Sequence, residues 1–263
     1  MYTAFASVYD RLMADVDYPA WAEFYRTLLV KYGISQGKVC ECACGTGNLT
    51  IWFAAMGYQV TGVDASPDML FEASQKARKH GAMIPFVKQD MRQLRLHRQM
   101  DAVLCTNDGV NYLEDETQLS EFFRAAYLTL KPGGAFLFDV STPYKLEHVL
   151  GDSFFGDELE DVAYLWRNHY SRSRLLVELD LVIFVRQKDG SYRRIHEHQK
   201  QFVHTSTQLK NLMQTAGFVD IVFFGDQQMQ PPSSQEARWH VAARKPLPVM
   251  EEGGAGVPYV SSE

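Results

Sequence analysis

The 263-residue chain has few cysteines, no excess of basic charge and no long apolar run. Its 4 cysteines include Cys40, Cys42 and Cys44, which lie too close together in the sequence to form a disulfide framework. No segment approaches the roughly 18 consecutive apolar residues that a membrane helix requires, so no membrane partner is expected. Residues 1–10 lack a basic stretch followed by an apolar run, which argues against a signal peptide. We therefore expect a cytoplasmic protein with reduced thiols.

Charge and composition narrow the class of protein further. The 26 Lys and Arg residues are outnumbered by 32 Asp and Glu residues, and the formal net charge is −6. Proteins that bind nucleic acid chiefly through its phosphates are normally basic, so nucleic acid is a disfavoured partner. The hydrophobic fraction of 46% allows a sizeable core and excludes a disordered chain. The sequence leaves the oligomeric state open.

The first two-thirds of the chain alternate short apolar runs with helical patterns, which is typical of parallel strands joined by crossover helices. Ser66 and Pro67 mark the start of one such helix, as an N-cap and a first-turn residue. We predict a doubly wound, mostly parallel seven-stranded sheet of α/β class. Its strands are expected at residues 39–43, 60–63, 84–87, 102–105, 135–140, 219–224 and 239–243, with helices at 49–56, 67–81, 119–130 and 207–216.

The alternation of strands and helices stops after the fifth strand. Residues 162–203 contain three strand-like stretches with little helix between them. The last two are joined by a turn at 188–190, which predicts an antiparallel β insert. The expected organisation has four parts. These are N-terminal helices at 1–34, a main domain at 35–145 and 205–245, an insert at 146–204, and a loose tail at 246–263 with little to bury.

Two glycines, Gly45 and Gly47, follow the first predicted strand and open the first helix. Glycine allows a ligand to approach the backbone closely, although a tight strand-to-helix turn alone would also use it. Asp64 ends the second strand about twenty positions later, where a carboxylate can accept both ribose hydroxyls of a nucleoside. Asp90 ends the third predicted strand. Taken alone, each carboxylate could instead be a helix cap or a surface charge. The carboxyl ends of adjacent parallel strands share one crevice, however, so we expect Gly45, Asp64 and Asp90 to converge on one ligand.

On these motifs the sequence resembles the class I S-adenosylmethionine-dependent methyltransferases, from about Phe5 to Arg244. The segments 101–113 and 130–134, the latter Leu-Lys-Pro-Gly-Gly, add to the resemblance. In members of this family the glycine turn packs against the methionine part of the cofactor. The acidic residue at the end of the second strand binds the ribose, and the acidic residue at the end of the third strand contacts the adenine. Ala43 stands where the family has its first glycine. The resemblance implies S-adenosyl-L-methionine as cofactor, bound by Tyr9, Trp21, Glu41, Ala43, Gly45, Gly47, Asp64, Ala65, Met69, Gln89, Asp90, Met91 and Thr106.

Proteins that bind NAD are the competing interpretation. Their fingerprint places a third glycine three residues after the second, and Thr50 occupies that place here. The Lys-Pro-Gly-Gly turn and the Asp90-Met91 pair also fit the methyltransferases better.

The layout is similar to that of glycine or sarcosine N-methyltransferases, which implies transfer of a methyl group to a small metabolite, at nitrogen or oxygen, by in-line displacement. Tyr9 and Trp21 would then belong to a lid over the cofactor, or simply anchor an N-terminal helix on the core. Asn107 and Asp108 follow the fourth strand and are the candidate catalytic residues, although a capped turn would use the same residues. The alternatives are a non-catalytic S-adenosylmethionine-binding sensor or partner protein, and a methyltransferase acting on tRNA or protein.

The insert carries residues whose role depends on which face is buried. Alternation places His196, His198 and His204 on one face of its last strand and Glu197, Gln199 and Gln201 on the other. A solvated face is favoured over a metal site for the histidines, so no metal is expected. Cys105, on the fourth strand, should lie close to Cys42 or Cys44. Such a thiol cluster beside the cofactor would make activity sensitive to oxidation, although small apolar core residues are the commoner role of free cysteine.

Overall fold

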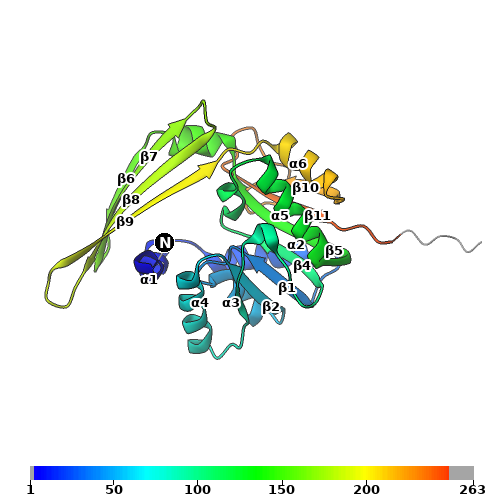
Figure 1. The fold of residues 1–263 in the computed structure, drawn as a ribbon, viewed down its shortest axis with the longest axis horizontal. Coiled ribbons are helices and arrows are strands. Elements are labelled where there is room, and N and C mark those ends of the chain that lie inside the picture. Colours follow the sequence, from blue (N-terminus) through cyan, green and yellow to red (C-terminus); the bar gives the residue numbers. More distant parts are fainter. Residues whose placement is uncertain (1–2, 249–263) are drawn as a thin grey trace, which may run out of the picture.

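The computed structural model describes residues 3–248 and contains two β-sheets, shown in Figure 1. The larger sheet has seven strands in the order β10-β11-β5-β4-β1-β2-β3. Strands β1 to β5 pair in parallel, and β11 pairs antiparallel with both β5 and β10. This confirms the predicted sheet. Its strands are β1 Lys38–Cys42, β2 Gln59–Asp64, β3 Phe86–Lys88, β4 Met100–Cys105, β5 Leu130–Ser141, β10 Val219–Phe224 and β11 Arg238–Arg244.

Helices cover both faces of this sheet, as a parallel sheet requires because both of its faces are apolar. Alternate residues of β5 point to opposite sides, so Phe136 and Phe138 pack with α5 and α6 while Leu137 packs with α2 and α3. Ser66 caps α4 by accepting a hydrogen bond from Met69 N at 3.3 Å, as predicted. The helices are α1 Thr3–Leu12, α2 Tyr18–Lys31, α3 Asn48–Ala55, α4 Pro67–Lys79, α5 Glu116–Thr129 and α6 Ser206–Thr215, with single turns η1 Met91–Gln93, η2 Gly109–Tyr112 and η3 Lys145–Leu150.

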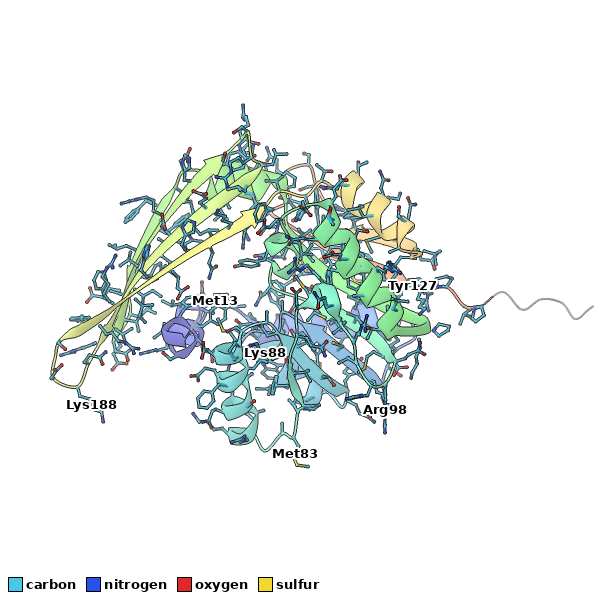
Figure 2. The ribbon with its side chains drawn as sticks, in the orientation of Figure 1. Met13, Met83, Lys88, Arg98, Tyr127 and Lys188 are labelled. Carbon is cyan, nitrogen blue, oxygen red and sulfur yellow. The ribbon has the colours of Figure 1, made fainter. Side chains whose placement is uncertain are left out.

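The insert forms a second, four-stranded antiparallel sheet in the order β6-β7-β8-β9. The predicted turn joins β8 to β9, and Lys188 lies at its tip (Figure 2). Strand β6 was not predicted. All five of its residues are exposed, and its Phe-Phe-Gly-Asp-Glu sequence lacks an alternating pattern, so it carries little strand signal. The strands are β6 Phe154–Glu158, β7 Val162–Ser171, β8 Leu176–Arg186 and β9 Tyr192–Phe202.

Helix α1 joins the two sheets. It lies beneath the concave side of the insert and beside α4 (Figure 1). Phe5 and Val8 are buried in one cluster with Ile183 of β8 and Met69 of α4. Polar contacts hold the helix on both sides. On one side, Arg11 forms an ion pair with Asp161 of the insert at 2.5 Å. On the other flank, Asp10 forms an ion pair and a hydrogen bond with the main domain, to Lys76 Nζ at 2.5 Å and from Thr46 Oγ1 at 2.6 Å.

Most of the predicted C-terminal tail, residues 249–263, lies outside the described residues. Within residues 3–248, none of the helices combines the length and the apolar character needed to cross a membrane.

Candidate functional site

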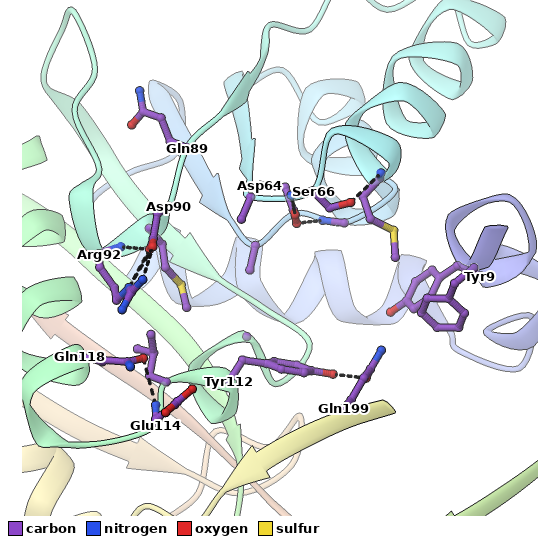
Figure 3. Close-up of a pocket in the computed structure, with 18 residues that line it drawn as sticks. Tyr9, Asp64, Ser66, Gln89, Asp90, Arg92, Tyr112, Glu114, Gln118 and Gln199 are labelled. Atoms are coloured by element: carbon purple, nitrogen blue, oxygen red, sulfur yellow. Dashed lines mark hydrogen bonds and ion pairs between the residues drawn. The ribbon is translucent and has the colours of Figure 1, made fainter. Parts of the chain in front are cut away.

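A cavity of about 400 Å³ opens at the carboxyl ends of β1, β2 and β3 and is closed from the side by α1 and η2. Figure 3 shows Asp64 and Asp90 on one side of it and Tyr112 and Gln199 on the opposite side. The structure therefore brings the two predicted carboxylates and Gly45 to one crevice. Nine predicted cofactor residues line it, namely Tyr9, Ala43, Gly45, Asp64, Ala65, Met69, Gln89, Asp90 and Met91.

Backbone donors fix the carboxylate of Asp64 at the end of β2. Gly45 N donates to Oδ2 and Ser66 N donates to Oδ1, each at 2.8 Å. Burial raises the pKa of Asp64, and these backbone hydrogen bonds act against that rise. Each carboxylate oxygen accepts more than one hydrogen bond, so the side chain keeps acceptor capacity for a ligand hydroxyl.

Asp90 lines the cavity and also caps a helical turn, so the cap that was one alternative for this residue is present. Its Oδ1 accepts from Arg92 N at 2.9 Å at the start of η1, and its Oδ2 pairs with the Arg92 guanidinium at 2.5 Å. The hydrogen bonds from Arg92 hold the pKa of Asp90 below its ordinary value, so the carboxylate is ionised at neutral pH.

A smaller recess of about 60 Å³ continues from the first cavity toward the end of β4. The predicted residues Glu41, Thr106 and Asn107 line it, together with Tyr18. Glu41 is fully buried and accepts hydrogen bonds from Thr50 and, at 2.8 Å, from Thr106 Oγ1. Burial raises the pKa of Glu41 to about 7, against the effect of these hydrogen bonds.

Tyr18 also lines this recess, although the sequence did not single it out as a cofactor contact. Its hydroxyl is buried beside the side chains of Asn48 and Asn107 but makes no hydrogen bond of good geometry to any residue in the range 3–248. A buried polar atom without a partner is rare in folded proteins, because it has lost its hydrogen bonds to water. The only local signal is its place at the start of α2, after the N-cap residue Asp17.

Two predicted cofactor residues lie away from these cavities. The Trp21 ring is buried against Tyr25 and His240, with the Arg238 guanidinium 4.9 Å from its centroid. Gly47 begins α3 with a φ of +74°, and a Cβ there would lie 3.0 Å from Ala73 Cβ. Trp21 thus packs α2 onto the main sheet, and Gly47 allows α3 to approach α4 closely.

The two candidate catalytic residues occupy a strained turn after β4. Asn107 and Asp108 both have left-handed backbone conformations, with φ of +58° and +61°, which non-glycine residues adopt at a cost. Asp139 holds this turn by accepting from both backbone nitrogens, at 2.7 Å from Asn107 and 3.0 Å from Asp108. Asn107 lines the smaller recess, whereas Asp108 lies outside the linings of the cavities described here.

Asp108 belongs to a buried charge network. The Arg238 guanidinium donates to both of its carboxylate oxygens, at 2.6 and 3.1 Å, and also binds Asp139. Lys145 Nζ lies 3.7 Å from Asp108 Oδ2. Burial alone would raise the pKa of Asp108, but the charges of Arg238 and Lys145 lower it to about 2. The side chain is therefore ionised and fully engaged.

A further cavity of about 210 Å³ lies between α1 and the concave face of the insert. Gln199 and Gln201 of β9 line this second cavity, which settles which face of the insert looks inward. On the opposite face, His196 and His198 lie 3.5 and 2.8 Å from Asp180 of β8. His204 does not share that face, because β9 ends at Phe202 and His204 is buried. No cluster of three metal-ligating side chains occurs among the described residues.

The prediction that Cys105 lies close to Cys42 is confirmed, in the core beside β1 and β4. Cys42 is the cross-strand partner of Cys105, and all four cysteines are buried and unpaired. Burial raises the pKa of Cys44 and of Cys105 well above the ordinary value, so these thiols stay protonated. Protonated, inaccessible thiols react slowly.

Comparison with known proteins identifies the family. The family described as "Methyltransferase domain" matches residues 39–134. The protein GWCH70_2453 of Geobacillus sp. (strain WCH70) is 35% identical to this chain over 245 residues. The match covers 93% of this chain and 99% of the relative, whose name gives it as a methyltransferase without stating the acceptor. The crystal structure of a S-adenosylmethionine-dependent methyltransferase from Clostridium acetobutylicum ATCC 824 superposes with a TM-score of 0.82 at 30% identity, over 93% of this chain and 99% of its own. The chain belongs to the class I S-adenosylmethionine-dependent methyltransferases.

More distant relatives of this methyltransferase include the glycine/sarcosine N-methyltransferase of Aphanothece halophytica. It is 27% identical over 213 residues, covering 78% of this chain and 74% of its own. The resemblance that the sequence motifs implied is therefore confirmed.

S-adenosylmethionine is the cofactor of this methyltransferase, and two features show that the residues present fit it. Gly45 has a φ of +54°, and a Cβ added there would meet no atom within 4 Å, so open space lies against the turn. The unpartnered Tyr18 hydroxyl lies in the recess beyond it. The first feature leaves room for the cofactor and the second supplies a polar group that a ligand would satisfy.

Proposed function

We propose that this methyltransferase transfers the methyl group of S-adenosylmethionine to a small molecule held in the second cavity, between α1 and the insert. One observation carries the proposal. Phe5, Tyr9, Tyr112 and Gln199 line both this second cavity and the larger cofactor cavity. A donor and an acceptor held in adjoining cavities are already positioned for direct displacement, which removes much of the entropic cost of bringing them together.

The proposed roles of the cofactor residues follow from their positions. Asp64 would hold the ribose hydroxyls, and Asp90 with Met91 would face the adenine. The recess lined by Glu41, Thr106 and Asn107 would take the methionine end. The bound cofactor supplies a methyl group already activated by a positively charged sulfur. The protein's own task is to align the acceptor with it and exclude water.

Tyr9 has a central place in this proposal. Its side chain lines the cofactor cavity, the recess and the second cavity. Burial raises the pKa of Tyr9 well above its ordinary value, so the hydroxyl remains a neutral hydrogen-bond donor. We propose that Tyr9 orients the reacting groups where the three spaces meet, and that α1 and the insert exclude water around it.

Asn107 and Asp108 enter the proposal with different roles. Asn107 would contact the methionine end directly, since it lines the recess. Asp108 would act as a positioning residue. It is engaged by Arg238, and its low pKa makes it a weak proton acceptor at neutral pH.

Isothermal titration calorimetry with S-adenosylhomocysteine tests the first half of the proposal, with Asp189→Asn on the exposed hairpin tip as a matched control for Asp64→Asn. Release of S-adenosylhomocysteine in a screen of small metabolites tests the second half. Binding followed by turnover supports the enzyme. Binding without turnover on any small molecule favours the non-catalytic sensor, and turnover only on tRNA or protein favours the macromolecular alternative. No binding refutes the proposal.

The size of the second cavity supports a small acceptor over a macromolecule. At about 210 Å³ it is smaller than the common range of about 300–1,000 Å³ for drug-sized ligands. We also propose a cytoplasmic location, which the buried, unpaired cysteines support.

A further inference from the structure

The second cavity has mostly apolar and aromatic walls. Strands β7 and β8 contribute Tyr164, Trp166, Leu179 and Leu181, and α1 contributes Leu12. An engineered apolar cavity of about 150 Å³ is large enough to bind benzene. At about 210 Å³, this cavity therefore has room for one ring with a few substituents.

Over the described part of the chain, the lining of the second cavity carries positive charge and no negative charge. Among the described residues that line it, Lys145 alone is charged. Its ammonium group makes no hydrogen bond within residues 3–248 and has a single ion-pair contact, to Asp108 at 3.7 Å. Arg238 already binds both oxygens of that carboxylate. The donors of Lys145 therefore remain available to an acceptor atom inside the cavity.

A second polar group in the cavity lacks a partner. Gln201 is 7% exposed, and its Oε1 is buried without a hydrogen bond to any described residue. The backbone of Gln201 is fixed in β9 opposite Val177, so its side chain starts from a rigid strand. A carbonyl oxygen in this state accepts a hydrogen bond from a ligand's O–H or N–H group.

We infer that the methyl acceptor is a ring-sized molecule with an acidic oxygen, a phenol or a carboxylic acid, which Lys145 attracts as the oxyanion and Gln201 orients through a second donor group. This rests on the proposed function, and it selects oxygen over nitrogen as the nucleophile. The positively charged sulfur of the methyl donor and Lys145 both repel a protonated amine, whereas both attract an oxyanion.

The reaction balances without any further reactant. The acceptor releases its proton to solvent as its oxyanion settles beside Lys145. A lone pair on that oxygen forms the new carbon–oxygen bond while the carbon–sulfur bond breaks, and the bonding pair stays on sulfur. The products are a methyl ether or ester, S-adenosylhomocysteine and the released proton.

The test compares matched ring compounds on the protein saturated with S-adenosylhomocysteine. Calorimetry measures binding of phenol against aniline and of benzoate against benzylamine, and methyl transfer from S-adenosylmethionine is then measured for all four. We expect benzoate to bind at least tenfold more tightly than benzylamine, because these are the two compounds of the four that carry a charge at neutral pH. We also expect the oxygen acids, and not the amines, to be methylated. Methylation of phenol alone or of benzoate alone distinguishes ether from ester formation.

Variants assign the effect to residues. Lys145→Met should weaken benzoate binding at least tenfold, Lys145→Arg should restore most of it, and Lys188→Met at the exposed hairpin tip should leave it unchanged. Gln201→Leu should weaken binding of 4-hydroxybenzoate, which carries both an anion and a donor, more than binding of benzoate. Retained affinity for S-adenosylhomocysteine shows that each variant is folded.

Several results would overturn the inference while leaving the proposed function intact. These are tighter binding of benzylamine than of benzoate, faster methylation of the amines, no binding of any of the four ring compounds at millimolar concentration, or equal benzoate affinity in Lys145→Met and the parent. Failure to bind S-adenosylhomocysteine would instead refute the proposed function itself.

Discussion

The Tyr112 hydroxyl donates a hydrogen bond to Gln199 Oε1 at 2.8 Å, and this contact joins the main domain to the insert. Tyr112 ends the helical turn after β4, and Gln199 lies on the last strand of the insert. Both side chains line the cofactor cavity and the second cavity. The hydrogen bond therefore lies at the boundary between the two cavities.

Tyr112→Phe removes this hydrogen bond and should therefore weaken binding of the cofactor product S-adenosylhomocysteine. Loss of one hydrogen bond between partly exposed groups costs about 1 kcal/mol, or roughly a fivefold change in affinity. We expect S-adenosylhomocysteine to dissociate about fivefold more readily, as measured by calorimetry. Tyr192→Phe, on an exposed residue of the same strand as Gln199, is the matched control. Equal affinities in the two variants would contradict the expectation.

Asp64→Asn should reduce cofactor affinity more strongly. The change removes a negative charge and places an amide NH₂ opposite one of the backbone donors Gly45 N and Ser66 N. Hydrogen bonds to a charged group contribute about 1.5–3 kcal/mol, so we expect roughly tenfold to hundredfold weaker binding of S-adenosylhomocysteine. Circular dichroism checks that the variant is folded, and unchanged affinity would remove Asp64 from the site.

Glu41 should make stability depend on pH. Its pKa is about 7 in the folded protein against an ordinary 4.5, so the folded state holds an extra proton between these values. Stability therefore falls as pH rises from about 4.5 to 7, by an amount on the order of 3 kcal/mol for a shift of this size. Urea unfolding at pH 5 and pH 8 measures the fall. Glu41→Gln should flatten it, and the same slope in both proteins would show that Glu41 is not its source.

The four thiols should react slowly in the native protein. Cys42, Cys44 and Cys105 have pKa values raised well above the ordinary value, and all four cysteines are buried. We expect Ellman's reagent to modify none of them within minutes under native conditions and all 4 in denaturant. Rapid native modification that S-adenosylhomocysteine suppresses would instead support a redox-sensitive cluster beside the cofactor.

The parallel sheet and the Gly45, Asp64 and Asp90 crevice could be predicted because their signals are local. Each strand is a short apolar run, and each carboxylate comes at or just after the end of one. Parallel strands then bring these ends to one edge whatever the rest of the chain does. The weak point was β6, whose exposed, acidic sequence gives no alternating pattern.

The surroundings of Asp108 could not be predicted in this way. Its partner Arg238 is 130 residues distant in the sequence and arrives on β11, which pairs antiparallel with β5. No spacing along the chain signals that contact. The same holds for Trp21, whose ring packs against Arg238 and His240 of that strand.

In the insert, the alternation of side chains did not predict which face of the sheet lines the cavity. Alternation separates Gln199 and Gln201 from His196 and His198, but it assigns neither pair to the inside. Helix α1, which comes from the other end of the chain and packs beneath the four-stranded sheet, makes that assignment.

The cofactor cavity is lined mainly by loops and helices at the strand ends of the main sheet, whereas the second cavity is lined mainly by α1 and the insert. Substitutions at Trp166 or Leu179 would reshape the room for the incoming molecule while leaving Asp64 and Asp90 unchanged. Under the proposed function, a change of methylated product requires changes on β7 and β8 alone, so these strands are the first place to mutate for new products.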